Sequence, residues 1–440
     1  MDALLNAESA AEPLSLFGRE AVKEELRRAI AAGDTRPETL WDTARDALAR
    51  RFAPTLVRAI NGTGVLLHTN LGRAPLSDPA RAAIAEVARG YSTVEYEPAR
   101  GARGKRQDHV RALACDLFGC ENAIAVNNNA AAVLVALAAL AHGRGVLVSR
   151  GELVAIGGSF KIPEILAASG ARLLEVGTTN RTTIEDYRAA LTAEVALLLS
   201  VHPSNYEIRG YTRRPAPAEL AALSREAGVP WLHDQGTGCV MPLDAFGVAD
   251  EPTVAECLAA GADLVSFSGD KLFAGPQAGF LVGRQEPVAK AAAHPVARAV
   301  RPDKLALAGL AATLKGWKTG AWRGFPVYRA AAASTASLEE RGLAILARAA
   351  LERKGVAGDL VPSKAAFGGG TSPEKLFPSR ALALSAKGRS ADAIASRLRE
   401  GEPPIVGRVE RERVLLDLRS IQAEEDEAVA AALSALPEMR

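Results

Sequence analysis

Short apolar runs alternate with longer stretches of helical spacing along most of the chain. The apolar runs are AIAV (123–126), GVLVS (145–149), ARLLEVG (171–177), VALLLS (195–200), VPWLHD (229–234) and ADLVSFS (262–268). Each run has the length and composition of a buried strand, and the stretches between them have the periodicity of helices. This alternation predicts an α/β fold in which helices cover both faces of a mostly parallel sheet.

The two ends of the chain follow other patterns. Residues 16–33 and 37–54 carry apolar residues at helical spacing with charges between them, which predicts a small helical domain over residues 1–58. After residue 309 a long helical pattern leads into strand-like segments and a closing helix, which predicts a smaller α+β domain over residues 310–440. The large α/β domain is therefore expected over residues 59–309.

Composition limits the class of protein without choosing its partner. The 440 residues are 48% hydrophobic and 24% charged, which is ordinary for a globular protein, and the net charge of +2 neither requires nor excludes nucleic acid. The alanine-rich run at 130–141 is too short to span a membrane and is expected to be a buried helix. The acidic start of the chain lacks the features of a secretory signal, so a cytoplasmic location is expected.

The four cysteines are expected to be reduced core residues. Cys115, Cys120, Cys239 and Cys257 form no CxxC pair and no spacing typical of a metal site. We therefore expect no bound metal.

Lys271, in FSGDKLFAGPQAG (267–279), is the first candidate catalytic residue. It lies between two strand-like segments among glycines, which allow the backbone to approach a bound group closely. A desolvated lysine there would have a lowered pKa and an amine able to form a Schiff base with an aldehyde. Taken alone, the same residue also fits an exposed turn.

Three further features favour the Schiff-base hypothesis. Ser268 lies where a hydroxyl would reach a phosphate, and the strand at 123–126 runs into a helix through Asn128, Asn129 and Ala130. A helix N-terminus offers free N–H groups to a phosphate, although the asparagines also fit simple N-capping. Asp234 ends a strand, where α/β sheets bind ligands. A lysine, an aspartate and a phosphate cradle are what pyridoxal 5′-phosphate requires.

Several segments in the same order resemble one enzyme family. SFSGDKLFAGPQAGFLVG (266–283), INGTGVLLHTNLGRAPLS (60–77), SRGELVAIGGSFKIPEI (149–165), VHPSNYEIRGYT (201–212) and HPVARAVRPDK (294–304) are similar to segments of bacterial L-seryl-tRNA(Sec) selenium transferase, or selenocysteine synthase. The likeness spans nearly the whole chain.

The resemblance implies a fold-type-I pyridoxal phosphate enzyme similar to aspartate aminotransferase. In it Lys271 would bind the cofactor aldehyde and Asp234 would pair with the pyridine nitrogen. The implied reaction converts L-seryl-tRNA(Sec) to L-selenocysteinyl-tRNA(Sec) through a dehydroalanyl-tRNA, with selenophosphate as selenium donor. The resemblance also implies a homodecamer built from dimers, with the helical domain at 1–58 binding the tRNA.

The selenium donor is an anion and requires cations. Arg298 and Arg301, which with Lys304 are spaced three apart, would share one side of a turn if this segment is helical. Guanidinium groups bind phosphate oxygens in pairs, but an isolated RxxR also fits a solvated helix face. The resemblance carries the anion-binding role to Arg73, Arg298 and Arg301.

Other residues remain open between two roles. Asp270 beside the lysine fits a proton relay during hydroxide loss, and it fits a turn cap equally well. Weaker pocket candidates are Arg150, Glu152, His68, His202 and Asn205. The run ARGARGKR (99–106) fits a phosphate-rich channel or a solvated loop.

Two alternative functions accompany the first. A related pyridoxal phosphate lyase would act on a small amino acid or amino sugar phosphate without tRNA, and it would have no need of residues 1–58. A tRNA-binding protein with a vestigial cofactor site is the other, and the presence of Lys271, Asp234 and the arginine pair argues against it.

Overall fold

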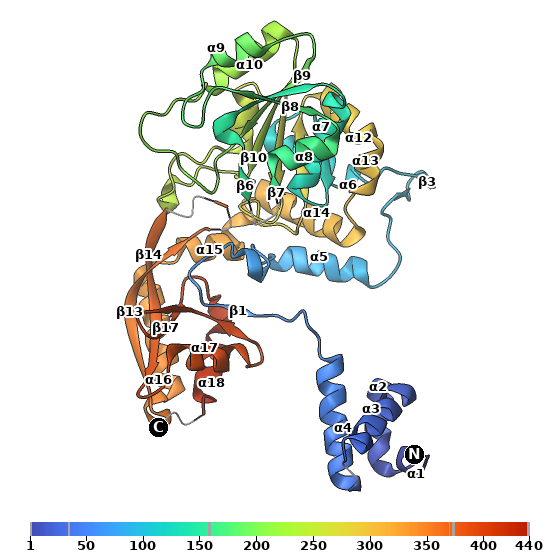
Figure 1. The fold of residues 1–440 in the computed structure, drawn as a ribbon, viewed down its shortest axis with the longest axis vertical. Coiled ribbons are helices and arrows are strands. Elements are labelled where there is room, and N and C mark those ends of the chain that lie inside the picture. Colours follow the sequence, from blue (N-terminus) through green and yellow to red (C-terminus); the bar gives the residue numbers. More distant parts are fainter. Residues whose placement is uncertain (1, 34–35, 157–159, 369, 372–374, 438–440) are drawn as a thin grey trace. The chain divides into compact units, whose positions relative to one another are not determined.

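The computed structural model describes residues 2–33, 36–156, 160–368, 370–371 and 375–437 (Figure 1). Contacts divide the chain into two compact units, residues 1–58 and 59–440. No helix among the described residues is both long and apolar enough to cross a membrane.

The unit at 1–58 is helical. Its helices are α1 (Asp2–Leu5), α2 (Ala11–Phe17), α3 (Arg19–Ala31) and α4 (Pro37–Phe52). Val22, Leu26, Trp41 and Leu48 bury the apolar faces of α3 and α4 against each other. The helical spacing over 16–33 corresponds to the end of α2 and to α3, which are separated by Gly18 with φ of 78°, a left-handed value that interrupts a helix.

A seven-stranded sheet forms the main layer of residues 59–440 (Figure 1). Its order is β4 (Asn122–Val126), β12 (Gly279–Gly283), β11 (Leu264–Ser268), β10 (Trp231–Gly236), β9 (Val195–Val201), β5 (Gly145–Ser149) and β8 (Arg172–Val176). Only β12 pairs antiparallel with its neighbours in this sheet. The predicted mostly parallel sheet is confirmed.

Alternate residues of each strand enter two hydrophobic clusters, one on each face. In β9, Leu198 belongs to one cluster, while Leu197 and Leu199 belong to the other. The first face is covered by α6 (Asp108–Phe118), α10 (Pro217–Ala227) and α14 (Lys304–Lys318), and the second by α7 (Asn129–Ala141), α8 (Ile162–Ser169) and α12 (Gln285–Ala293). Because both faces are buried, the strands are continuous apolar runs rather than alternating ones.

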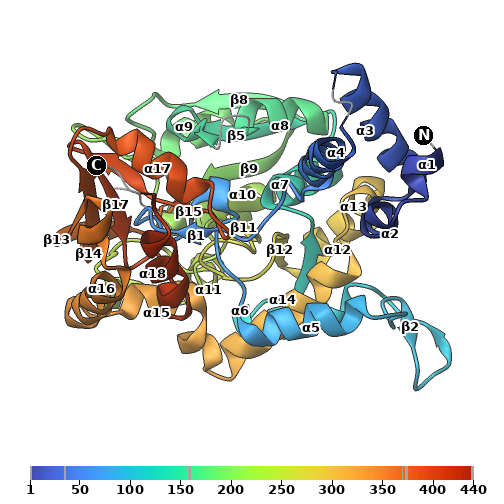
Figure 2. The same ribbon diagram turned by 90° about the horizontal axis from the view of Figure 1, so that it is seen from below.

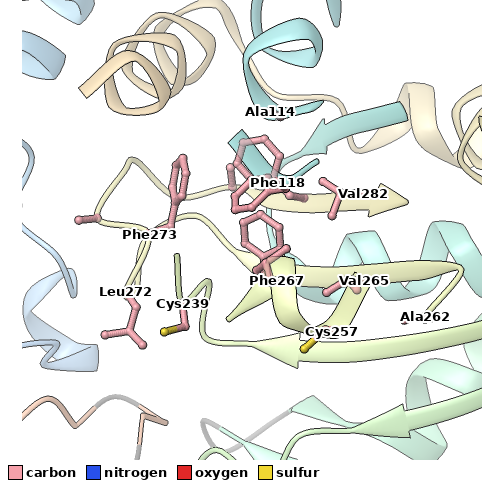
Figure 3. Close-up of a cluster of buried hydrophobic side chains, with 14 of the residues drawn as sticks. Ala114, Phe118, Cys239, Cys257, Ala262, Val265, Phe267, Leu272, Phe273 and Val282 are labelled. Atoms are coloured by element: carbon pink, nitrogen blue, oxygen red, sulfur yellow. The ribbon is translucent and has the colours of Figure 1, made fainter. Parts of the chain in front are cut away.

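Aromatic rings pack beneath the segment that carries Lys271 (Figure 3). The Phe267 ring lies 5.1 Å from those of Phe118 and Phe280 and 6.1 Å from that of Phe273, measured between centroids. Phe267 belongs to β11 and Phe273 to the following turn, so this cluster fixes both ends of the segment at 268–272. Lys271 therefore lies in a segment that is anchored at both ends in the hydrophobic core.

Replacing Phe267 with alanine should lower the free energy of unfolding by about 3–5 kcal/mol, because it leaves a cavity among the three remaining rings. Urea denaturation measures the change, with Val409→Ala as an exposed control expected to change stability by less than about 0.5 kcal/mol. A loss below about 1 kcal/mol for the Phe267 variant would show that the cluster does not carry this part of the fold.

The C-terminal part contains a four-stranded antiparallel sheet. Its order is β13 (Val356–Ala366), β14 (Leu376–Ala386), β17 (Arg413–Asp417) and β16 (Arg408–Glu410), packed with α16 (Thr335–Ala349), α17 (Ala391–Arg399) and α18 (Asp426–Ser434). The boundary expected between residues 309 and 310 falls inside α14, which runs alongside α5 (Asp78–Ala88) (Figures 1 and 2). The division into 59–309 and 310–440 stays a prediction.

Candidate active site

The candidate residues meet at one edge of the large sheet. Asp234 in β10 pairs in register with Ser266 in β11, Ser268 pairs with Gly279, and Gly279 pairs with Val126 at the end of β4. Because β4, β10 and β11 run parallel, their carboxyl ends lie together. The segments after these ends carry Asn129 and Lys271, so chain positions more than a hundred residues apart converge.

Lys271 is buried, with 5% of its surface exposed. The backbone of its turn is held by Leu272 N, which donates to Thr237 O at 2.9 Å, and by Gly269 N, which donates to Ala278 O at 2.7 Å. The exposed-turn interpretation is therefore wrong. Burial, followed by the positive charge of Arg73, lowers the pKa of the Lys271 amine. Among the described residues none makes a hydrogen bond with that amine, so it is free to react.

Asp234 accepts hydrogen bonds at only one of its two carboxylate oxygens among the described residues. The residue is 3% exposed, and its Oδ1 accepts hydrogen bonds from Asn129 Nδ2 at 2.8 Å and Ser266 Oγ at 2.9 Å. Its Oδ2 accepts none from the part of the chain that the structure describes. Burial raises the pKa of the carboxyl group against these two bonds. A cationic ring nitrogen at Oδ2 would offset that burial.

The predicted phosphate cradle is a helix N-terminus. Asn128 caps α7 by accepting a hydrogen bond from Ala131 N at 2.8 Å, so its side chain takes the N-capping role. The backbone N–H groups of Asn129 and Ala130 have no acceptor within the described ranges. Gly279 packs against this turn, and a Cβ there would lie 2.1 Å from Asn128 O. Ser268 is buried beside them, and its hydroxyl makes no hydrogen bond to a described residue.

Asp270 and Arg73 form an ion pair next to the lysine. Arg73 Nη1 donates to Asp270 Oδ2 at 2.6 Å, and Ala74 N donates to Asp270 O at 3.2 Å. The φ of Arg73 is 61°, a left-handed value that costs energy for a residue other than glycine. This pair brings the segment at 60–77 to the turn of Lys271. The Asp270 carboxylate binds Arg73 rather than capping its own turn.

Arg298 and Arg301 lie on different elements. Arg298 is in α13 (Pro295–Ala299), whereas Arg301 follows that helix, and Lys304 begins α14. The shared helical side was the wrong prediction, because Pro302 cannot continue the hydrogen bonding of α13. Arg301 Nη1 donates to Glu95 Oε1 at 3.2 Å. No contact recorded for the described residues joins either arginine to Lys271 or Asp234.

The Arg301 segment nevertheless touches the cradle. Asn127 N donates to Val300 O at 2.8 Å, so the residue before Arg301 is bonded to the turn that begins α7. Glu95 also pairs with Arg103 and Arg106. The run at 99–106 contains β3 (Ala102–Arg103), which forms a hairpin with β2 (Tyr96–Glu97) just before the run, so it is not only a loop.

Comparison with known proteins decides the family. Residues 59–422 match the family of L-seryl-tRNA selenium transferase. The L-seryl-tRNA(Sec) selenium transferase of Geobacter metallireducens is 44% identical over 435 residues, covering 96% of this chain and 94% of that protein. The chain belongs to the L-seryl-tRNA selenium transferase family. The enzyme of that name from Moorella thermoacetica is 47% identical over 378 residues, covering 85% and 80% of the two chains.

Solved structures agree on the fold. D-glucosaminate-6-phosphate ammonia-lyase superposes with a TM-score of 0.60 at 20% identity, covering 88% of this chain and 97% of that one. The fold-type-I architecture predicted from the sequence is confirmed. Pyridoxal 5′-phosphate, the predicted cofactor, is confirmed by the family together with this fold.

The described residues fit this cofactor. Asn129 Oδ1, Arg73 Nε and His68 Nδ1 are buried polar atoms without a hydrogen-bond partner in the described ranges, although such atoms are nearly always paired in a finished site. Asn129 is bonded to Asp234 and Arg73 to Asp270, so both belong to the site itself. A polar group bound at this site would offer a partner to Asn129 Oδ1 and Arg73 Nε.

The weaker pocket candidates make hydrogen bonds with residues other than Lys271. Glu152 is buried, accepts a hydrogen bond from Val201 N at 2.9 Å, and has its pKa raised to about 7 by burial. Arg150 Nε instead donates to Glu175 Oε2 at 2.7 Å. Asn205 Nδ2 donates to Ala155 O at 3.3 Å. None of these contacts reaches Lys271.

A buried network that the sequence did not reveal supports the lysine turn. Glu251 Oε2 lies 3.2 Å from His202 Nε2, and Glu251 Oε1 accepts from Gln235 Nε2 at 3.1 Å and from Thr237 Oγ1 at 2.5 Å. Gln235 and Thr237 lie one and three residues after Asp234, and this closeness in the sequence was the signal that could have revealed them. Glu251 gave none, since it lies in a loop of ordinary composition.

The cysteines are free thiols in the structure. Cys239 and Cys257 are buried, and burial raises the pKa of both thiols, to about 12 for Cys257, so both stay protonated near neutral pH. Within the described ranges no group of three or more His, Cys, Asp or Glu side chains is arranged to hold a metal ion.

Proposed function

We propose that this protein converts L-seryl-tRNA(Sec) to L-selenocysteinyl-tRNA(Sec), with selenophosphate as the selenium donor. One observation supports the proposal most directly. In this chain the buried amine of Lys271 lies at the same sheet edge as Asp234, whose carboxylate accepts hydrogen bonds at Oδ1 and, among the described residues, none at Oδ2. We place the reaction in the cytoplasm, where charged tRNAs are used.

The chain offers one binding group for each part of the cofactor. Lys271 would hold the aldehyde, Asp234 Oδ2 the ring nitrogen, and Ser268 with the free N–H groups of Asn129 and Ala130 the phosphate. When bound, pyridoxal 5′-phosphate supplies a carbonyl for the serine amine and a ring that accepts the electron pair left at Cα.

The residues around the serine then divide the proton transfers. The Lys271 amine is available as a base, because burial and Arg73 favour its neutral form, and it would take the Cα proton. Asp270 would guide the departing β-hydroxyl, and Arg73 fixes its carboxylate in place at 2.6 Å. The burial of Lys271 and Asp234 would limit the access of water to the reacting group.

The selenium donor would meet Arg73, Arg298 and Arg301. Arg73 lies beside Lys271, while Arg298 is exposed and Arg301 is joined to the cradle through Val300. In the proposed decamer, built from dimers, the arginines after α12 of one subunit would serve a site shared with another. Guanidinium groups would select an oxyanion over an uncharged nucleophile.

Replacing Arg298 and Arg301 with alanine should leave loss of serine from seryl-tRNA intact and lower selenium transfer at least about a hundredfold, the scale of two charged contacts at about 1.5 kcal/mol each. Parallel assays of serine loss and selenium incorporation separate the two steps. The control is Arg397→Ala, which removes an exposed arginine paired with Glu400. Normal selenium transfer in the double variant would contradict the donor site.

Incubation with seryl-tRNA(Sec), seryl-tRNA(Ser) and free serine in parallel tests the function. Consumption of serine from seryl-tRNA(Sec) alone is expected, because we assign tRNA binding to the helical domain at 1–58. A chain lacking residues 1–58 should lose this turnover while keeping the cofactor. Turnover of a free amino acid, unaffected by that deletion, would favour the small-molecule lyase instead.

A further inference from the structure

A cavity opens beside the candidate active site. It has a volume of about 330 Å³ and lies where β5, β8 and β9 end. Its lining comes from Ser149 and Gly151 after β5, from the segment 179–182 after β8, and from the segments 203–208 and 212–214 after β9. Pro203 of this lining follows His202, whose N–H donates to Asp234 O at 2.9 Å. The cavity therefore begins one strand away from Asp234.

Three arginines of the lining have no side-chain partner. Arg181, Arg213 and Arg214 are exposed, and none makes a side-chain hydrogen bond or ion pair with any residue that the structure describes. Glu207, the one acid of the lining, is already bound by Arg209, whose Nη2 lies 2.8 Å from Glu207 Oε2. The cavity is thus cationic, and its cations are available to a ligand.

The backbone holds these arginines together without using their side chains. Arg213 N donates to Asn180 O at 3.1 Å, and Thr182 N donates to Arg213 O at 3.0 Å. Two loops that follow different strands are joined in this way, so the guanidinium groups of Arg181 and Arg213 start from paired positions. A site made by two clamped loops needs no rearrangement to present two charges.

An exposed aromatic ring lies next to the arginines. Tyr211 is 96% exposed, and its carbonyl oxygen accepts a hydrogen bond from Asn180 Nδ2 at 2.7 Å. A fully exposed tyrosine beside cations is the combination that binds single-stranded nucleic acid, where bases stack on rings and arginines meet phosphates.

The neighbouring cavity has the opposite charge. It has a volume of about 580 Å³ and is lined by Asp244, Asp250, Glu251 and Glu256. Pro203 and Arg214 line both cavities. A polyanion at this sheet edge would be repelled from the acidic cavity and drawn to the arginine cavity.

We propose that Arg181, Arg213 and Arg214, with Tyr211, bind the unpaired 3′ end of the aminoacyl-tRNA and so direct its serine toward Lys271. This inference rests on the proposed function, since it names the part of the substrate that this cavity binds. The arginines hold phosphates and Tyr211 stacks on a base, so the site recognises a single strand rather than a particular sequence.

The test uses the full-length protein with bound cofactor and compares two RNAs. One is seryl-tRNA(Sec), and the other is the same tRNA trimmed of its unpaired 3′ nucleotides. The wild type should bind the trimmed RNA about tenfold more weakly or worse, the scale of one or two stacked bases. Arg213→Gln with Arg214→Gln should show a smaller difference in Kd between the two RNAs than the wild type, and its KM for seryl-tRNA should rise while kcat changes little.

Two further variants make the comparison specific. Arg172→Gln removes an exposed arginine paired with Glu194 at the amino end of β8, the opposite edge of the sheet, and should behave as wild type. Tyr211→Ala should also reduce the difference between the RNAs, but unlike the arginine variant it should leave the salt dependence of binding unchanged.

Four results would overturn the inference. The first is an equal Kd of the wild type for both RNAs. The second and third concern the arginine variant: a difference in Kd between the RNAs as large as in the wild type, or an equal weakening of its binding to both RNAs. The fourth is an arginine variant that consumes the seryl group normally but transfers selenium slowly. The last would assign the arginines to the free oxyanion donor. Failure of the wild type to convert the seryl group of seryl-tRNA(Sec) is a separate result, which would instead refute the proposed function.

Discussion

Lys271→Ala should lower turnover of seryl-tRNA(Sec) by at least about ten-thousandfold, because in the proposed mechanism this one side chain both binds the cofactor and moves the Cα proton. The variant should also lose the visible absorbance of the covalently bound cofactor. Its fold should persist, since the substitution removes a buried amine that makes no hydrogen bond with any described residue. Absorbance spectra, steady-state kinetics and thermal unfolding together measure the three outcomes.

The pH dependence of the same residue gives an independent check. Burial lowers the pKa of Lys271 in the folded state, so between that lowered pKa and the ordinary lysine value the unfolded chain binds more protons. The stability of the cofactor-free wild type should therefore rise with pH across this window, and that contribution should disappear in Lys271→Ala. An alanine variant with normal turnover and absorbance would remove Lys271 from the site.

Asp234→Asn should lower turnover by at least about a thousandfold, corresponding to about 4 kcal/mol. The amide has the shape of the carboxylate, so the bonds from Asn129 and Ser266 can be kept in part, but it cannot hold a proton on the ring nitrogen. The covalent link at Lys271 should still form, so the variant should be coloured but inactive. Kinetics and the absorbance spectrum distinguish this outcome from loss of the cofactor.

Asp244→Asn is the matched control for this substitution. Asp244 lines the acidic cavity without bonding to the cradle, and it should retain the turnover of the wild type. If Asp234→Asn kept more than about a tenth of the activity, the electrostatic role of this carboxylate would be wrong.

The sheet could be predicted from the sequence because both of its faces are buried. GVLVS at 145–149 and GFLVG at 279–283 are strands with the expected bounds, and the alanine-rich run at 130–141 is buried in α7. The break at Gly18 and the end of α13 before Arg301 were missed. Each of these breaks depends on a single residue. Gly18 has a left-handed φ, and Pro302 has no backbone N–H group. The spacing of apolar residues over a whole segment does not reveal such single interruptions.

The site could be predicted only where a residue type carried the chemistry. Lys271 and Asp234 could be proposed because they stand at the ends of apolar strands, and the registers of β10 and β11 bring these strand ends together. The pairing of Arg73 with Asp270 joins positions 197 residues apart, and no local pattern predicts such a contact. Glu251 and the arginine cavity were missed for the same reason, since loops from several strands build them.

The central claim is that the Lys271 amine carries pyridoxal 5′-phosphate. Reduction of the purified protein with borohydride, digestion and mass spectrometry of the labelled peptide measure this directly. We expect the adduct on the peptide containing Lys271, at that residue and no other lysine. An adduct on a different lysine, or none in a protein that converts the seryl group of seryl-tRNA(Sec), would contradict the account.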